Sequence, residues 1–541
     1  MQPSSFCSLA TYGCHREMFG LLLSISLYHK NTTVYCLVDT KTKEYIINST
    51  PKIDLNIVWI VLLDEYTGLD RSAMEAQGVW ADFQMQKAMI ISEALQNEDD
   101  TLFLDSDILL LDTIEDVDKS KQLGVSPHYI SKSRTDIFGY YNGGMLWTNQ
   151  KSLKNDWIEF TKTSRYFDQA SIEDLVEKYD AFQFGENYNF SWWRITQSDD
   201  SPQNVINNLS ILDDKQLCYK KKSLKFIHTH FNETRQDVKL FNDVILKCLN
   251  YIKDYKSLLI INRMVTGKWA VQIPQQPIEG KWYHSNDSFR ELLVLVEEKN
   301  KDLELEIINN SGHVWLNGNI LLYDRPTTEW IDEQSLQCYK LLLGNGSIDK
   351  EGVELKDKNI DVSPWIFWPR RPSILEQKLG EGIVNYEDRN IESIFIGNYE
   401  NYIQQDFRNN PEWENEIEEF YCTAGTNHRF SQEEYLDKIR HSKYGLCLRG
   451  FGSKCHREVE LMAFGTVPLM TPEVSMNSYS DPLIENTHYI LINDPLEVKE
   501  KIKDINRREW NRMSAACYIW YRRNVHSDNC WNNILDNIFY K

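Results

Sequence analysis

The sequence contains no run of about 20 uncharged apolar residues, the length that a membrane-spanning helix needs. Its 11 cysteines show no Cys-x-x-Cys spacing, which disfavours a disulfide framework and a structural zinc site. Positive charge is scarce, since the formal net charge is -21, and this disfavours nonspecific binding to nucleic acid or anionic lipid. We therefore expect reduced thiols, no membrane span and no nucleic-acid partner.

The sequence does contain enough apolar residues for several folded domains. Its 541 residues exceed the usual size of one core, and 42% of them are hydrophobic. Residues 6–11 already have the pattern of a first strand, which leaves no room for a signal peptide before them. We expect about two to four domains and a cytoplasmic location, unless an upstream anchor has been removed.

The N-terminal residues alternate between strand and helix patterns. We predict strands over residues 6–11 and 34–39, with a helix over residues 18–28 between them. A strand, a helix and a strand in this order form a βαβ unit, so the sequence predicts a parallel sheet.

Three polar residues lie where a nucleotide can bind such a sheet. Thr11 ends the first strand, at the edge where open α/β sheets bind nucleotides. Asp39 ends the next strand, where its carboxylate can contact a base or ribose or can cap a helix. Lys87 lies in the apolar stripe of a helix predicted over residues 79–95, and such a lysine either extends to solvent or reaches a ligand phosphate.

An apolar strand over residues 101–104 runs into two carboxylates, Asp105 and Asp107. Because side chains alternate along a strand, both carboxylates are predicted to face one point. Such oxygen ligands suit Mg²⁺ or Mn²⁺. The same pattern can simply end a strand in a turn, or open a haloacid-dehalogenase phosphatase site with Asp105 as nucleophile. The phosphatase is disfavoured because Ile108 stands where that site carries threonine or valine.

Three further segments carry candidate ligands. Asn142, Gly143 and Gly144 predict a turn before an apolar strand, where glycines let the backbone approach a ligand and the amide can read sugar hydroxyls. Asp168 and Gln169 open a helix predicted over residues 166–179. The strand pattern at residues 225–231 places His228 and His230 on one face, and this pair favours a metal site. The candidate residues are Asn142, Gly143, Gly144, Asp168, Gln169, His228 and His230.

In this order, the motifs resemble those of the glycogenin-like and related GT-A glycosyltransferases, over residues 1–250. The resemblance implies that Asp105, Asp107 and either His228 or His230 bind Mn²⁺ or Mg²⁺, which holds the diphosphate of a nucleotide sugar. It also implies that the Asn142–Gly144 segment contacts the donor sugar. Asp168 and Gln169 would then lie beside the sugar and the acceptor.

Residues 262–340 change character. Short alternating runs at residues 292–296 and 303–308 predict a small antiparallel β unit. The tryptophans Trp269, Trp282 and Trp315 punctuate it, and they either fill its core or stack on sugar rings.

The last 150 or so residues predict a second α/β unit, with strands over residues 393–398 and 444–448. The second strand leads through Arg449 and Gly452 into a helix whose N-terminus can hold a diphosphate. Helical geometry places Arg457 and Glu460 on one face, where they either contact phosphate and ribose or form an ion pair in solvent.

This segment resembles the exostosin family and related GT-B glycosyltransferases. The matching positions are Ser442, Gly452, Arg457, Glu460, Gly465 and Pro468. The resemblance implies that this half binds a nucleotide sugar without metal. It leaves open whether the half is an active second transferase or a donor-binding remnant.

We therefore predict an α/β protein with three parts: a GT-A Rossmann-like domain over residues 1–261, a small β-rich unit over 262–340 and a Rossmann-like GT-B half over 341–541. The predicted activity is transfer of sugars from nucleotide-sugar donors, UDP-sugars at the first centre, to a glycan or glycoprotein. The alternatives are a single transferase with a noncatalytic C-terminal domain, and a lectin-like scaffold with both centres inactive.

Overall fold

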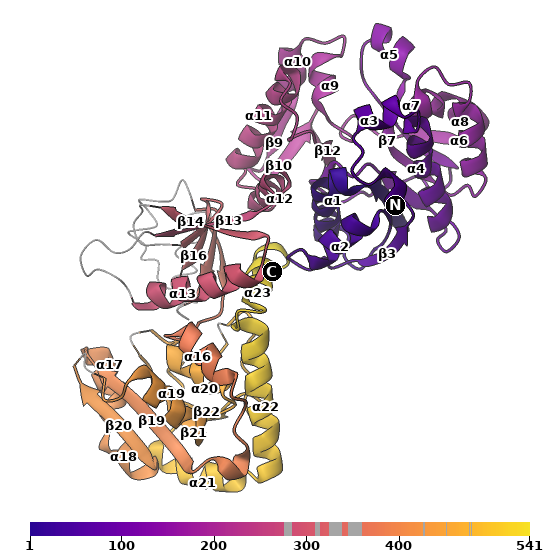
Figure 1. Cartoon of the computed structure of the whole chain (residues 1–541). Coiled ribbons are helices and arrows are strands. Elements are labelled where there is room, and N and C mark those ends of the chain that lie inside the picture. The colour runs from indigo at the N-terminus through magenta and orange to yellow at the C-terminus, as the bar shows by residue number, and fades with distance from the viewer. Residues whose placement is uncertain are drawn as a thin grey trace. The chain divides into compact units, whose positions relative to one another are not determined.

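The computed structural model describes residues 1–274, 284–308, 314–323, 338–344, 360–425, 428–450, 452–474, 476–477 and 479–541. The chain divides into two compact units, Met1–Lys268 and Trp269–Lys541, and both combine helices with sheets (Figure 1). Within the described ranges, no helix is long and apolar enough to cross a membrane. All 11 cysteines lie in these ranges, and the structure joins none of them in a disulfide.

The first unit is built on a seven-stranded sheet in the order β3-β2-β1-β4-β7-β6-β8. Its strands are β1 (Ser5–Ala10), β2 (Thr33–Val38), β3 (Asn56–Val61), β4 (Thr101–Leu104), β6 (Leu123–Pro127), β7 (Tyr141–Thr148) and β8 (Ala181–Gln183). β1 runs parallel to β2 and β4, whereas β7 runs antiparallel to β4 and β6. The predicted βαβ unit and parallel sheet are confirmed here, because the helix α1 (His15–Tyr28) connects β1 to the parallel β2.

Helices and two small sheets complete the first unit. The helices are η1 (Tyr12–Cys14), α2 (Thr40–Asn48), η2 (Asp64–Tyr66), α3 (Arg71–Ala76), α4 (Trp80–Ala94), α5 (Lys132–Phe138), α6 (Leu153–Thr161), α7 (Phe167–Ala170), α8 (Ile172–Lys178), α9 (Trp192–Thr196), α10 (Pro202–Asn207), α11 (Gln236–Tyr251) and α12 (Tyr255–Thr266). β5 (Ile108–Leu110) pairs with β12 (Phe226–His228), and β10 (Gln216–Tyr219) pairs with β9 (Leu209–Leu212) and β11 (Lys222–Ser223).

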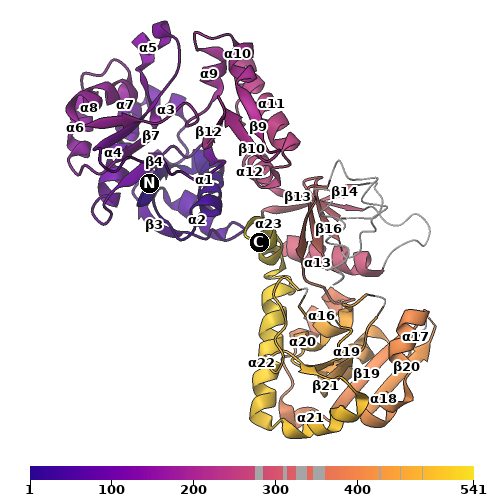
Figure 2. The ribbon, with the colours of Figure 1, turned by 180° about the vertical axis from the view of Figure 1, so that it is seen from behind.

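The amphipathic pattern of residues 79–95 forms the predicted helix, α4. Its apolar stripe packs into a core that includes Leu37, Phe103 and Trp157, and burial of such side chains drives the packing. Figures 1 and 2 show α4, α6 and α8 close together in this unit. Lys87 follows the stripe inward and is buried, so the predicted alternative of a solvent-exposed lysine is wrong.

The second unit begins with a six-stranded sheet in the order β14-β13-β15-β16-β17-β18. Its elements are β13 (Trp269–Pro274), α13 (His284–Lys299), β14 (Leu303–Ile308), β15 (Val314–Leu316), β16 (Ile320–Tyr323), β17 (Lys340–Leu343) and β18 (Asp361–Pro364). The sheet is mixed rather than antiparallel as predicted, since β13 is parallel to β14 and antiparallel to β15.

The predicted strand at residues 292–296 is also wrong. These residues lie inside α13, where Phe289, Leu292, Leu293 and Val296 are buried at helical spacing. A short apolar run fits a strand and a helix equally well, and its longer context decides. Trp269 and Trp315 are buried in the core, as one alternative predicted, and Trp282 lies outside the described residues.

A parallel five-stranded sheet in the order β20-β19-β21-β22-β23 forms the rest of the second unit. Its elements are α16 (Pro372–Leu379), η3 (Tyr386–Asp388), β19 (Ile391–Tyr399), α17 (Tyr402–Arg408), α18 (Pro411–Glu416), β20 (Glu419–Ala424), α19 (Gln432–Arg440), β21 (Ser442–Cys447), α20 (His456–Ala463), β22 (Val467–Met470), β23 (Ile490–Leu491), η4 (Pro495–Glu497), α21 (Val498–Asp504), α22 (Arg507–Asn524) and α23 (Cys530–Phe539).

The C-terminal helices join the two sheets of this unit. Figures 1 and 2 both show α22 running alongside the five-stranded sheet. The next helix, α23, reaches the six-stranded sheet, where Phe539 contacts Trp269 of β13 at 5.8 Å between ring centroids. The six-stranded sheet takes strands from residues 269–364. The division of this unit into separate domains at 262–340 and 341–541 stays a prediction.

Candidate functional site

The paired aspartates lie where the chain leaves the main sheet. β4 ends at Leu104, and the Ile108 N–H donates to the Asp105 carbonyl at 3.2 Å, so residues 105–107 form a turn. β5 then pairs antiparallel with β12, with Ile108 opposite His228. The prediction that strand alternation aims the two carboxylates is therefore wrong in mechanism, because the strand has already ended. The turn and the β5–β12 pairing bring the aspartates to the histidines instead.

Asp107, His228 and His230 converge on one point. The Asp107 Oδ1 atom lies 2.9 Å from His228 Nε2, and its Oδ2 atom lies 3.5 Å from His230 Nδ1. One ligand atom from each of the three residues falls within a cluster 4.8 Å across, which can hold a metal ion. Asp105 lies at its edge, with Oδ2 3.9 Å from His228 Nε2. Both predicted histidines therefore reach the predicted aspartates.

The electrostatics of this cluster favour a cation. Burial alone would raise the pKa of Asp107, but His228 lowers it to about 2. Burial lowers the pKa of His230 to about 4, so this imidazole is neutral and able to bind a metal. Burial would likewise lower the pKa of His228, but the Asp107 carboxylate and the hydrogen bond to it raise that pKa.

The donor set fits a divalent cation. Carboxylates and imidazoles are ligands that Mn²⁺ accepts. His230 turns its Nδ1 atom toward Asp107, and its buried Nε2 atom has no hydrogen-bond partner among the described residues, so no protein group competes for this imidazole. Asp107, His228 and His230 would hold the ion, with Asp105 beside them.

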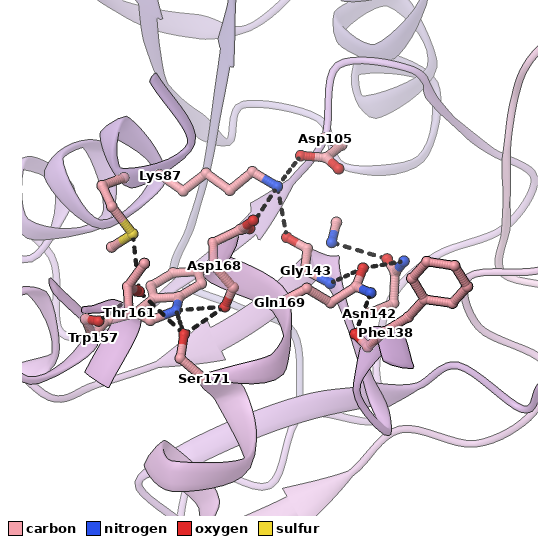
Figure 3. Close-up of polar contacts among 12 residues, drawn as sticks. Lys87, Asp105, Phe138, Asn142, Gly143, Trp157, Thr161, Asp168, Gln169 and Ser171 are labelled. Carbon is pink, nitrogen blue, oxygen red and sulfur yellow. Dashed lines mark hydrogen bonds and ion pairs between the residues drawn. The ribbon is translucent and has the colours of Figure 1, made fainter. Parts of the chain in front are cut away.

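Lys87 connects the acidic turn to the predicted sugar site. Its Nζ atom lies 3.1 Å from Asp105 Oδ1 and 3.2 Å from Asp168 Oδ2, and it donates to the Gly143 carbonyl at 3.1 Å (Figure 3). Only 8% of the Lys87 side chain is exposed. One buried cation thus holds two carboxylates from different elements, so Lys87 belongs to the site.

The two glycines lie inside β7, so the predicted turn at residues 142–144 is wrong. A Cβ atom on Gly144 would lie 2.7 Å from Asp105 Oδ2 and 2.6 Å from His228 Cε1. A Cβ atom on Gly143 would lie 2.7 Å from Asp168 Oδ2. The strand is glycine-rich because side chains from three other segments approach its backbone, not because the chain turns.

Asn142 and Gln169, two of the predicted sugar-site residues, contact each other through their side-chain amides (Figure 3). Gln169 Oε1 accepts from the Gly143 N–H and from Asn142 Nδ2, each at 3.4 Å, and Gln169 Nε2 donates to the Phe138 carbonyl at 2.7 Å. The structure therefore brings together Lys87, Asp105, Asp107, Asn142, Gly143, Gly144, Asp168, Gln169, His228 and His230.

Asp39 has a different environment. Its Oδ1 atom accepts from the Thr42 N–H at 2.7 Å and caps α2, the second of the two predicted roles. Its Oδ2 atom accepts from the Tyr12 N–H at 2.9 Å, and this bond holds the loop after Thr11. Both Thr11 and Asp39 are buried, and their contact with a nucleotide stays a prediction.

Two site residues escaped prediction, His128 and Asn189. Both are buried, and they join Asn142 and His228 in one chain of hydrogen bonds. Neither residue belongs to a recognisable sequence motif. A single polar residue also gives no sign in the sequence that it will be buried.

The second unit places its predicted residues in internal contacts. Arg457 Nη2 donates to the Ile396 carbonyl at 3.0 Å. Glu460 is 2% exposed and accepts from the Arg370 N–H and from Tyr435 Oη, at 2.8 Å and 2.7 Å. Glu460 forms no solvent-exposed ion pair with any described residue, so that alternative is wrong for it. Ligand binding by Arg457 and Glu460 stays a prediction.

Arg449 and Gly452 lie at the start of the loop before α20. Among the described residues, the buried Nε atom of Arg449 has no hydrogen-bond partner. Arg408, which the sequence did not single out, is buried beside this loop and donates to the Asn398 and Arg449 carbonyls at 2.6 Å and 3.0 Å.

A cavity of about 590 Å³ between α22 and α23 is lined by residues that include Arg522 and Asn533, and none of the predicted site residues lines it.

No family model matches the sequence, and no curated protein matches it. Three solved glycosyltransferases are weakly similar in structure. The galactosyltransferase LgtC, with donor and acceptor sugar analogues, is 14% identical with a TM-score of 0.31 and covers 45% of this chain and 95% of its own. GlyE of Streptococcus pneumoniae TIGR4 is 9% identical with a TM-score of 0.28, and the match covers 94% of this chain and 100% of GlyE. Mouse xyloside xylosyltransferase 1 is 10% identical with a TM-score of 0.28, and the match covers 42% of this chain and 97% of the mouse protein. Similarity this low assigns no activity, so the residues of the site have to carry any assignment.

Proposed function

We propose that the first unit is a metal-dependent glycosyltransferase that takes its sugar from a nucleotide-sugar donor, a UDP-sugar, and passes it to a glycan or glycoprotein. One observation carries the proposal. Asp107, His228 and His230 converge within 4.8 Å beside the buried Lys87, Asp105 and Asp168. This combination offers a cation site and a polar sugar site side by side, at the end of a mostly parallel sheet.

In this reaction the bond between the sugar C1 and the diphosphate oxygen breaks. An acceptor hydroxyl forms the new bond to C1, and its proton is released. A divalent cation held by Asp107, His228 and His230 would neutralise the charge that develops on the leaving diphosphate. We place Mn²⁺ there, with Mg²⁺ as the alternative.

The chain's own residues position the sugar. Gly143 and Gly144 let the side chains of Asp105, Asp168 and His228 approach the strand. The amide of Gln169, which Asn142 contacts at 3.4 Å, is the group offered to the sugar hydroxyls. Lys87 holds the Asp168 carboxylate in place by the 3.2 Å contact, so that it orients the sugar and the acceptor. Thr11 and Asp39 would meet the nucleotide at the ends of the first two strands.

Hydrolysis of the donor tests this proposal without knowledge of the acceptor. The full chain is incubated with a panel of nucleotide sugars, with Mn²⁺ and then with a chelator. A transferase releases the nucleotide diphosphate from at least one donor only when the metal is present. A lectin-like scaffold releases none from any donor, and that result would refute the assignment.

We further propose that the second unit binds a nucleotide sugar at the loop before α20. Support comes from the carboxyl edge of its parallel sheet and from the buried Nε atom of Arg449, which has no hydrogen-bond partner in the part of the chain that the structure describes. Two forms of this proposal differ: a second transferase, which makes the chain bifunctional, and a noncatalytic sugar- or nucleotide-binding domain.

Separate variants distinguish these forms. Asp107→Asn should stop transfer at the first centre, and Arg449→Gln should stop a different step if the second unit is catalytic. If Arg449→Gln weakens nucleotide-sugar binding but removes no step, the second unit is noncatalytic. If it changes neither binding nor any step, the unit has no such site.

A further inference from the structure

A chain of buried side chains connects the sugar-site strand to the metal cluster. It runs from His128 through Asn142 and Asn189 to His228, and Asn189 is 1% exposed. Asn142 Nδ2 lies 2.9 Å from His128 Nε2, and Asn189 Nδ2 donates to Asn142 Oδ1 at 2.8 Å. Asn189 Oδ1 lies 2.9 Å from His228 Nδ1.

Two backbone groups determine every hydrogen in this chain. The Gly144 N–H can only donate, and its 2.9 Å bond identifies the Asn142 atom that it meets as the carbonyl oxygen. The Gly139 carbonyl can only accept, and its 3.4 Å contact with His128 Nδ1 leaves His128 Nε2 as the acceptor for Asn142 Nδ2. Both ends therefore require the same orientation of Asn142.

The orientation passes to His228. Because Asn142 Oδ1 is an acceptor, Asn189 must present its NH₂ group to it, and its own carbonyl oxygen then faces His228 Nδ1. That oxygen can only accept, so Nδ1 carries a hydrogen. His228 Nε2 is the nitrogen that donates to Asp107 Oδ1 at 2.9 Å, and a cation bound in the cluster would take the place of that hydrogen.

We propose that Asn189 is a positioning residue that fixes His228 as the Nδ1–H tautomer, with Nε2 directed at the cation, and so couples the metal cluster to the sugar-site strand. The inference rests on the proposed metal-dependent function. Groups that hold the second nitrogen of a metal-binding histidine contribute roughly 10-fold to 100-fold in metal affinity.

The backbone at Asn189 makes clean variants possible. Its φ is +51°, in the left-handed region that glycine and aspartate tolerate. Asn189→Gly removes the side chain and leaves His228 Nδ1 without its acceptor. Asn189→Asp keeps that acceptor but loses the donor to Asn142 Oδ1. Asn31, an exposed residue with φ of +58°, provides a matched control outside the chain of hydrogen bonds.

The test measures Mn²⁺ affinity of the full chain by calorimetry, and the His228 tautomer by ¹⁵N NMR at alkaline pH, with His228→Gln to assign the signal. Asn189→Gly should weaken Mn²⁺ binding about 10-fold or more. Asn31→Gly should keep the affinity of the unchanged chain, and Asn189→Asp, which retains the acceptor for His228 Nδ1, should lose less affinity than Asn189→Gly. The unchanged chain should show the Nδ1–H form.

Wild-type affinity in Asn189→Gly, or an Nε2–H tautomer in the unchanged chain, would overturn the inference. Neither readout needs a turnover. If no nucleotide sugar is hydrolysed but these results hold, the proposed function fails and the positioning role stands. If donors are hydrolysed with Mn²⁺ while Asn189→Gly binds the ion normally, only the positioning role fails.

Discussion

The two units hold the charged side chains of their predicted sites in opposite ways. In the first unit, Asp107 meets His228 and His230, and the Nε2 atom of His230 has no partner among the described residues. In the second unit, Arg457 and Glu460 are already satisfied by protein groups. Motifs of similar strength in the sequence therefore have different outcomes, and the first unit has the better case for a reactive centre.

The largest expected effect is a loss of donor hydrolysis, and it shows whether the first unit carries the reaction. Asp107→Asn removes the charge that the two imidazoles share and should reduce metal-dependent donor hydrolysis by about 1,000-fold or more. The measurement is the release of nucleotide diphosphate under saturating donor. Asp118→Asn, at an exposed position, should have no effect. If Asp107→Asn keeps full activity, the reaction does not take place in the first unit.

Lys87→Met should destabilise the first unit by about 3 kcal/mol, because it leaves the buried Asp168 carboxylate without its cation. Urea denaturation measures this loss. Lys121→Met is the control, since its partner Asp180 is 60% exposed, and it should unfold as the unchanged chain does. Equal stability of the two variants would show that Lys87 does not hold the site together.

Gly144→Ala tests the close approach at β7. A methyl group there would lie 2.7 Å from Asp105 Oδ2, so we expect Mn²⁺ affinity to fall about 100-fold with the fold retained. Gly13→Ala is the control, because its nearest neighbour would be Thr11 Oγ1 at 3.8 Å. Unchanged affinity in Gly144→Ala would mean that the strand can move away from the cluster without cost.

The smallest expected effect concerns pH and the second unit. Burial raises the pKa of Glu458 to about 7, above its value in the unfolded chain. This raised pKa makes a contribution to stability that is complete below about pH 4.5 and is lost as pH rises to about 7. Glu458→Gln should therefore stabilise the protein by about 2 kcal/mol at pH 8 and change little at pH 4.5. Thermal unfolding at both pH values checks this, and equal shifts would contradict it.

Local patterns predicted several of the elements, and the family resemblance predicted which motifs of the first unit meet. The strand and helix patterns of residues 6–39 and 79–95 are continuous, so burial periodicity identifies them. Residues 292–296 and 142–144 were assigned wrongly because a short apolar run and a glycine pair each fit two structures. The flanking residues determine the structure in both cases, so residues 292–296 lie in the helix α13 and residues 142–144 lie in the strand β7.

The supporting residues could not be predicted. Asn189, His128 and Arg408 act through contacts with residues far away in the sequence, and no spacing marks them. Their roles depend on the packing of several segments, which only coordinates describe.

Diffraction from crystals grown with Mn²⁺ and UDP, recorded at the manganese absorption edge, tests the central claim most directly. The predicted result is one anomalous peak in the first unit, bound by Asp107 and His228 or His230 and in contact with the diphosphate. A manganese ion that touches neither Asp107 nor the histidines, or UDP bound without any ion, would contradict the account.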